Sequence, residues 1–291
     1  MTRISFPGLA TPPLALLFLL TLGLQGCGDG ETEVSDGSPA PRTRVTLTGS
    51  STMAPVVLEI AKGFEARNPA IRIDVQTGGS GRGIRDARTG TADIGMASRE
   101  LKPGEDGLRT IPLARDGLAF ITHANNPVKN LTREQIRRIY LGETGNWRDV
   151  GGPDQVIVLV HKAEGRGTLD MFLTYFELDN TKIKPDVIVG DNAQGIKTVA
   201  GSAGAIGYVS LGPAQAAAEE GTAIRLLDFD GRTPTLTGIE RGEYPVSRNL
   251  NFILGKDPEG AVKDFIGFAL SEDSQAVIRS FSFSPVASPL S

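Results

Sequence analysis

The sequence has little of what most catalytic and metal sites require. Its 291 residues include one cysteine, two histidines and one tryptophan. A single cysteine excludes an intrachain disulfide and a cysteine-based metal site, and two histidines argue against a zinc site. Positive charge is also scarce. The net charge of −4 argues against the broad basic surface that binds nucleic acid. We therefore expect no metal, no cofactor and no nucleic-acid partner.

Long hydrophobic runs are missing too. The N-terminal run Leu14–Leu22 follows the lone charge of Arg3, is too short to span a bilayer, and lies just before Cys27. This pattern indicates an export signal over residues 1–26. Small residues before the cysteine resemble a bacterial lipobox, so we expect Cys27 to be lipidated and the protein to lie in the periplasm or on the outer face of the membrane. The alternative is a plain secretory signal with an incidental cysteine.

The composition of residues 27–43 differs from that of the rest of the chain. These residues are polar, small or proline, so we expect a flexible tether there. From Arg44 onward strands alternate with helices, which favours an α/β fold with largely parallel sheets. The pattern by itself does not establish two lobes. Expected strands include 44–48, 71–75, 93–97, 119–122 and 156–160, and expected helices include 53–67, 84–87, 132–140, 169–176 and 192–200.

One local design occurs four times: a small-polar or glycine-rich turn follows a strand and precedes a helix. A helix N-terminus offers unpaired N–H groups and partial positive charge, and glycine lets backbone approach a ligand. Several such turns brought together would form an oxyanion cradle. Taken singly, each turn is better explained as a helix cap and tight turn that binds nothing. The turns contain Ser51 and Thr52, Ser80, Ser98, and finally Arg166, Gly167 and Thr168.

Motifs of common enzymes fail in detail. Ser80 does not stand in a G-x-S-x-G elbow, and Ile84 stands where a dinucleotide-binding loop needs its third glycine. The run 190–195 resembles the start of a P-loop, but its lysine, Lys197, comes one place late. With no evident nucleophile or metal cluster, we expect a protein that is not an enzyme; a phosphatase is the weaker alternative.

The same turns carry a family resemblance. The segments GSST (49–52), GGSGRGI (78–84), TADIGMASREL (91–101) and YPVSRNL (244–250) occur in the order typical of PstS-type phosphate-binding proteins. Residues 44–288 resemble that family. The resemblance implies a two-lobed type II periplasmic-binding-protein fold, each lobe a mostly parallel sheet flanked by helices. Lobe I would comprise 44–116 and 247–291, lobe II would comprise 117–246, and crossovers would lie near 115–120 and 244–251.

The resemblance also implies the ligand residues Ser51, Thr52, Ser80, Ser98, Gly167 and Thr168. Two positions depart from the family. Lys162 stands where the family usually has arginine, and Arg166 stands where it has the first serine of GSGT. We expect Arg166 to supply the main cationic contact and Lys162 a secondary one, because arginine forms a planar fork and lysine a point charge. Glu164 would orient either cation. Arg99 stands where some members carry a proton-accepting aspartate, which leaves selectivity open.

We therefore expect a monomeric, lipid-anchored solute-binding protein that captures inorganic phosphate by cleft closure and presents it to an ABC permease. Two alternatives remain from the sequence. The site would suit another tetrahedral oxyanion, or the chain would be a surface lipoprotein that keeps the scaffold without transport.

Overall fold

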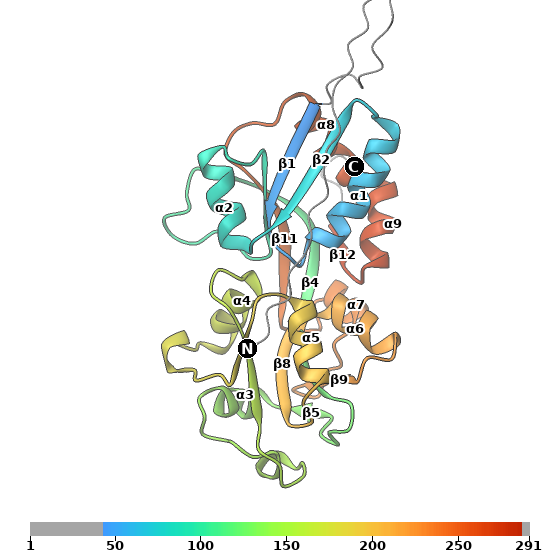
Figure 1. The fold of residues 1–291 in the computed structure, drawn as a ribbon. Helices are drawn as coiled ribbons and strands as arrows, with labels where there is room; N and C mark the ends of the chain where they lie inside the picture. Colours follow the sequence, from blue (N-terminus) through green and yellow to red (C-terminus); the bar gives the residue numbers. More distant parts are fainter. Residues whose placement is uncertain (1–42, 287–291) are drawn as a thin grey trace, which may run out of the picture. The chain divides into compact units, whose positions relative to one another are not determined.

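The computed structural model describes residues 43–286, and strands alternate with helices along most of this chain (Figure 1). The first half contains β1 (Thr43–Gly49), α1 (Ala54–Arg67), β2 (Ile71–Thr77), α2 (Ser80–Thr89), β3 (Ile94–Ala97), β4 (Arg109–His123), β5 (Asn130–Leu131), α3 (Arg133–Tyr140) and the 3-10 helix η1 (Trp147–Val150). The second half contains β6 (Val158–Lys162), α4 (Gly167–Phe176), η2 (Asn180–Lys182), β7 (Val187–Val189), α5 (Asn192–Ala200), β8 (Ala205–Ser210), α6 (Leu211–Glu219), β9 (Ile224–Leu226), β10 (Asp228–Phe229), α7 (Leu236–Glu240), β11 (Ser247–Leu254), α8 (Gly260–Ala269), α9 (Glu272–Ser280) and β12 (Ser284–Pro285).

The strands form a mixed sheet in the order β2-β1-β3-β11-β4-β8-β6-β7. At one end β1 is parallel to β2 and β3, and at the other β6 is parallel to β7 and β8. The centre is antiparallel, because β11 pairs with β3 and β4, and β4 pairs with β8. Figure 1 shows β4 and β11 running between the two groups of elements. The crossover expected near 115–120 therefore lies in β4, and the one expected near 244–251 ends within β11.

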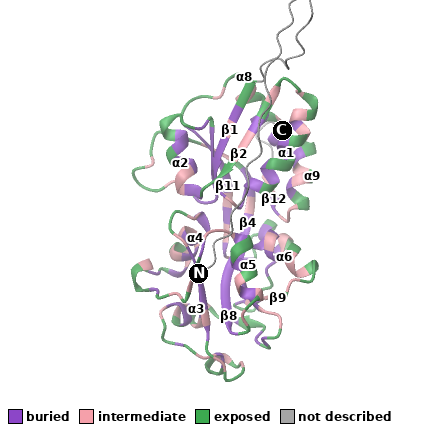
Figure 2. Cartoon of the chain, viewed as in Figure 1, coloured by how far each residue is buried: buried purple, intermediate pink, exposed green. Residues whose placement is uncertain are grey.

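Buried apolar residues gather into two large clusters, one toward each end of the β4–β11 pair. One surrounds Phe64, Phe252 and Phe265, and the other surrounds Tyr140 and Trp147. Figure 2 shows that the central strands are buried along most of their length. The described residues 43–286 nevertheless belong to one compact unit.

Several local expectations agree with the structure. The segment 192–200 forms α5, and the N-terminus of α3 has the capping box expected from its sequence, in which the Thr132 side chain accepts from the Gln135 N–H and the Gln135 side chain accepts from the Thr132 N–H. Other bounds were wrong. The tether was expected to reach residue 43, but β1 begins there. Helix α2 begins at Ser80 inside the glycine run, because Gly79 with φ +91° caps it.

The largest error concerns β4, which spans 15 residues where only 119–122 were expected. Polar Arg115 and Asp116 interrupt its apolar pattern, yet Asp116 is fully buried because Arg248 pairs with it. Helices α6 and α7 were not anticipated. None of the helices in residues 43–286 is long and apolar enough to cross a membrane. The expected signal, Cys27 and the tether up to residue 42 lie outside the described residues.

Candidate anion-binding site

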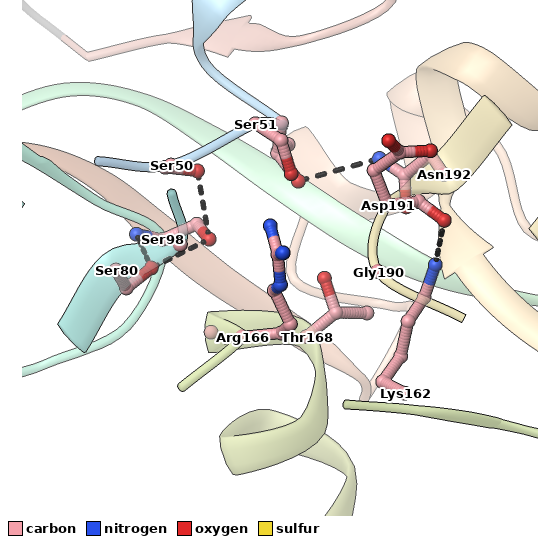
Figure 3. Close-up of a pocket in the computed structure, with 13 residues that line it drawn as sticks. Ser50, Ser51, Ser80, Ser98, Lys162, Arg166, Thr168, Gly190, Asp191 and Asn192 are labelled. Carbon is pink, nitrogen blue, oxygen red and sulfur yellow. Dashed lines mark hydrogen bonds between the residues drawn. The ribbon is translucent and has the colours of Figure 1, made fainter. Parts of the chain in front are cut away.

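The four turns singled out in the sequence meet at one small polar pocket. It lies where the turns after β1, β2 and β3 face the turns after β6 and β7 (Figure 3). Every site residue expected within 43–286 lines it. The full lining is Ser50, Ser51, Thr52, Gly79, Ser80, Ser98, Lys162, Arg166, Gly167, Thr168, Gly190, Asp191 and Asn192.

The pocket collects the N-terminal ends of helices α1, α2, α4 and α5. Three of these helices, α1, α2 and α4, have no N-cap side chain bonded to their first turn. Only α5 is capped in this way, by Asp191, whose carboxylate accepts from the Gln194 N–H at 2.8 Å. First-turn N–H groups and helix dipoles therefore favour negative charge in the space between them.

One side of the pocket, here the hydroxyl wall, consists of Ser50, Ser80 and Ser98. All three are at most 2% exposed. The Ser50 hydroxyl donates to Ser98 Oγ at 3.1 Å, the Ser98 N–H donates to Ser80 Oγ at 3.0 Å, and the Ser80 and Ser98 hydroxyls lie 3.2 Å apart. Two bonds among three hydroxyls use two of their three hydrogens. One O–H therefore remains to donate to a ligand.

The opposite side, here the cation wall, consists of Lys162, Arg166, Gly167 and Thr168. Lys162 ends β6, and Arg166 is the N-cap of α4. In Figure 3 the Arg166 side chain points into the space between the serines and Lys162. Among residues 43–286, neither cation forms an ion pair with a carboxylate. Their charge is thus available to an anion in the pocket.

Burial makes Lys162 unusual among the lysines of this chain. The residue is 3% exposed, and its Nζ donates to the Asp191 carbonyl oxygen at 2.5 Å. The pKa of Lys162 is lowered to about 7: burial lowers it most, the Asp191 carboxylate raises it, and the charges of Arg248 and Arg166 lower it. A bound anion would restore the protonated form by supplying the missing counter-charge.

Glycine lets the two walls touch. A Cβ at Gly167 would lie 2.5 Å from Ser80 Oγ and 2.6 Å from Ser98 Oγ. A Cβ at Gly79 would lie 2.6 Å from the Gly165 carbonyl oxygen, which accepts a hydrogen bond from the Gly81 N–H at 3.2 Å. No other residue type fits at Gly79 or Gly167 without moving the walls apart.

A third group links the walls beside the pocket. Thr52 Oγ1 accepts from Asn192 Nδ2 at 3.3 Å and from Arg248 Nη2 at 3.4 Å, and it lies 3.1 Å from Ser210 Oγ. Arg248 also pairs with Asp116 at 2.8 Å. Burial raises the pKa of Asp116 even though the Arg248 charge opposes this shift.

Sequence reasoning missed part of this site. Gly190, Asp191 and Asn192 line the pocket, although the sequence pointed only to a failed P-loop there. The usable signal was the position of this turn, which stands between strand β7 and helix α5 as three of the four expected turns stand between a strand and a helix. The expectation that the Ser98 turn also precedes a helix was wrong, because the chain after β3 continues into strand β4. Glu164, expected to orient a cation, is exposed and forms no ion pair among the described residues, so that expectation was wrong.

Arg99 has a different role from the aspartate found at its position in some relatives of the resembled family. Its guanidinium binds Glu105 at 2.6 Å and Asp170 at 3.0 Å, and Lys102 also pairs with Asp170. The Arg99 guanidinium holds the pKa of Glu105 below its usual range. Asp170 belongs to the first turn of α4, so this cluster joins the loop after β3 to the helix that starts at the cation wall.

The arrangement is suited to holding an oxyanion. Hydroxyls, helix N–H groups and two cations all donate toward the pocket, and no histidine contacts the serines that line it. His161 bonds instead to Asn180 and Tyr208, at 2.9 and 3.1 Å, and burial lowers its pKa. Within residues 43–286, no group of three or more His, Cys, Asp or Glu side chains is arranged to hold a metal ion.

The mixed sheet is curled, and its paired strands β4 and β11 run between two groups of elements. An anion pocket lies between the helix ends of these two groups. Together these features define a periplasmic binding protein. The comparisons agree. Residues 34–273 match the PBP superfamily domain. The expected fold class and the resemblance to PstS-type proteins are confirmed.

Individual relatives show which group of proteins within the superfamily this chain is similar to. A solved structure from Clostridium perfringens, assigned as a phosphate ABC transporter substrate-binding protein with bound phosphate, is 33% identical, has a TM-score of 0.79, and covers 84% of this chain and 100% of its own. An ABC-type phosphate transport receptor from Vibrio cholerae is 31% identical with a TM-score of 0.70, over 83% of this chain and 100% of its own. The phosphate-binding protein PstS of Bacillus subtilis is 29% identical over 272 residues, 91% of this chain and 89% of its own. The chain belongs to the PBP superfamily and, within it, to the substrate-binding proteins of phosphate ABC transporters.

Proposed function

We propose that this chain captures inorganic phosphate for an ABC importer. The observation that carries the proposal is the convergence on one pocket of uncapped helix ends, serine hydroxyls and two cations that have no carboxylate partner within residues 43–286. A phosphate ion has acceptor oxygens in a tetrahedral arrangement, which such a set of donors can surround. The Clostridium perfringens relative, solved with bound phosphate, supports the same ligand.

Capture by closure is part of this proposal. Lobe I would comprise 44–116 and 247–291 and lobe II 117–246, with Ser51, Thr52, Ser80 and Ser98 on lobe I and Lys162, Arg166, Gly167 and Thr168 on lobe II. An anion between the walls would join both lobes, so it would stabilise the closed form that a permease recognises.

Binding without chemical change is also part of it. Ser50, Ser80 and Ser98 bond to one another and to backbone rather than to a base that would activate them as nucleophiles. The relatives reported above are named for binding and transport rather than for catalysis. We therefore propose a reversible, monomeric binding protein.

A lipid anchor at Cys27 would keep the protein at the outer face of the membrane. The support is the apolar run that ends just before the only cysteine. Cys27→Ser should move the protein from the membrane fraction to the soluble fraction after cell fractionation. Retention of the variant in the membrane fraction would refute the anchor.

Calorimetry tests the ligand. Protein lacking residues 1–26, stripped of bound ligand by unfolding and refolding, is titrated with phosphate, arsenate, sulfate, molybdate and tungstate. We expect heat from phosphate and arsenate, and a rise in Tm with phosphate because binding favours the folded state. Tighter binding of molybdate, tungstate or sulfate would favour the second candidate, a binder of another oxyanion, which the departures at Lys162 and Arg166 support. Heat from none of the five would favour the non-transport lipoprotein.

A further inference from the structure

Arg248 is the most highly connected buried cation of the described chain, and the sequence pointed to it only as part of a family segment. Its side chain is 4% exposed. Its Nε and Nη2 donate to Asp116 Oδ2 at 3.1 and 2.8 Å, and its Nη1 donates to the Ser98 carbonyl oxygen at 3.0 Å. Nη2 further contacts Ser210 Oγ at 2.9 Å and Thr52 Oγ1 at 3.4 Å.

These contacts place Arg248 behind the anion pocket rather than in it. Arg248 is absent from the residues that line the pocket, whereas Thr52 and Ser98 are among them. The fully buried Asp116 already balances its charge. Arg248 therefore acts on a ligand through the groups it holds.

The position of the pair in the sheet matters as much as its contacts. Arg248 and Asp116 face each other in the antiparallel register of β11 and β4, the two strands that run between the groups of elements. From there the guanidinium reaches Thr52 and Ser98, from the turns after β1 and β3, and Ser210 at the end of β8. One rigid fork thus touches pieces of both sides of the site.

The hydrogen bonds of Thr52 show how Arg248 affects a residue that lines the pocket. A threonine hydroxyl has two acceptor lone pairs and one hydrogen. Asn192 Nδ2 donates to Thr52 Oγ1. Arg248 Nη2 has two hydrogens; one is held by Asp116, and the other is shared between Ser210 Oγ at 2.9 Å and Thr52 Oγ1 at 3.4 Å, so both lone pairs of Thr52 face a donor. The Thr52 O–H can then only donate, either to Ser210 Oγ at 3.1 Å or to an anion in the pocket.

We propose that Arg248, held by Asp116, is a positioning residue that directs the Thr52 hydroxyl to donate toward the bound anion. This inference rests on the proposed function, and it names which buried pair sets the polarity of that site. Without Arg248 one lone pair of Thr52 is free, and the hydroxyl can turn to accept instead of donating.

A double-mutant cycle between Thr52 and Arg248 tests this. Arg248→Gln alone leaves Asp116 buried and unpaired, so the cycle uses the paired variant D116N/R248Q, which removes both buried charges and keeps amide partners. Phosphate affinity is measured by calorimetry for Thr52→Val in the wild-type and D116N/R248Q backgrounds, with circular dichroism and Tm as folding controls. We expect Thr52→Val to weaken binding about tenfold in wild type and by less than about twofold in D116N/R248Q.

Arg115→Gln supplies the matched control. Arg115 is the neighbour of Asp116 on β4, and its contact is a 3.4 Å bond to Ser247 Oγ away from the pocket. Thr52→Val should keep its full cost in that background. Arg248→Lys should behave like D116N/R248Q, because a single ammonium cannot reach the same acceptors.

The outcomes separate this inference from the proposed function. If wild type binds phosphate and Thr52→Val costs the same in both backgrounds, Arg248 has a structural role only and the inference is overturned. If wild type binds arsenate, sulfate, molybdate or tungstate but not phosphate, the cycle is run with that ion, and only the identity of the ligand changes. If wild type binds none of the five, both proposals fall.

Discussion

The two walls of the pocket offer an anion different chemical groups. The hydroxyl wall is neutral, and its serines are bonded to one another before any ligand arrives. The cation wall holds Lys162 and Arg166 without carboxylate partners among the described residues, and burial lowers the pKa of Lys162 to about 7. The hydroxyl wall is therefore preorganised by its own hydrogen bonds, whereas the cation wall needs an anion to balance its charge. The difference indicates that the hydroxyl wall positions the ligand and the cation wall supplies most of the binding energy.

We expect the largest effect from a substitution that disrupts the contact between the two walls. Gly167→Ala would place a Cβ within 2.6 Å of the Ser80 and Ser98 hydroxyl oxygens. We expect phosphate affinity to fall by about a hundredfold or more, at the upper end of the roughly 1–3 kcal/mol that overpacking costs. Folding should survive, since alanine favours a helix start over glycine. Calorimetry and circular dichroism measure both effects.

Gly267→Ala is the matched control, because a Cβ there in α8 meets nothing within 4 Å. It should bind phosphate like wild type. Wild-type affinity in Gly167→Ala as well would mean that the walls do not close this tightly around the ligand.

We expect the second-largest loss of affinity from removing charge from the cation wall. Arg166→Ala should cost about 1.5–3 kcal/mol of binding, or roughly ten- to a hundredfold in affinity, the contribution of hydrogen bonds to a charged group. Lys162→Ala should cost less near neutral pH, because Lys162 is only partly protonated there in the free protein. The comparison is made by calorimetry at one pH.

Arg82→Ala controls for loss of an arginine near a helix start. Arg82 lies in the first turn of α2, pairs with Asp86 at 3.0 Å and does not line the pocket. It should leave affinity unchanged. If Lys162→Ala abolishes binding while Arg166→Ala binds like wild type, the displaced arginine is not the main contact.

The pH dependence of the cation wall gives a third, smaller effect. Above about pH 7 free Lys162 is mostly neutral, so anion binding must take up a proton, and affinity should fall by up to about tenfold per pH unit. Below about pH 7 this loss disappears because the ammonium is already present. The charges that face Lys162 are those of Asp191, Arg166 and Arg248.

Lys162→Arg isolates the effect, since arginine stays charged at every pH used. The measured quantity is the ratio of wild-type to Lys162→Arg affinity from about pH 6 to about pH 9. The titration of phosphate itself cancels in this ratio. A ratio that stays flat across the range would show that Lys162 does not change protonation on binding.

The hydroxyl wall should give the smallest effect. Ser98→Ala removes the hydroxyl that accepts from Ser50 and pairs with Ser80. We expect a loss of about 0.5–1.5 kcal/mol, or roughly two- to tenfold in affinity, with no change in the pH profile. Ser274→Ala is the control, because Ser274 is as buried but bonds to Phe268 in another part of the molecule. A loss for Ser98→Ala larger than for Arg166→Ala would reverse the roles of the two walls.

Local parts of the fold could be predicted because their causes are local. The capping box of Thr132 and Gln135 and the extent of α5 depend on neighbours in the chain. β4 could not be predicted, because burial of Asp116 depends on Arg248, 132 residues further along. For the same reason the sequence missed Asn192, whose amide meets Thr52 across 140 residues.

By itself the sequence determined which turns are chemically equipped to bind an anion. Ser51, Thr52, Ser80, Ser98, Lys162, Arg166, Gly167 and Thr168 were all found from turn chemistry and family resemblance, and all line one pocket. Only the tertiary structure decided that these turns meet, that Asp191 and Asn192 complete the lining, and that a buried Asp116–Arg248 pair stands behind them. The physical reason is the distance along the chain over which each kind of interaction acts. Capping and turn preferences act over a few residues, whereas desolvation and charge pairing depend on groups that only the folded chain brings together.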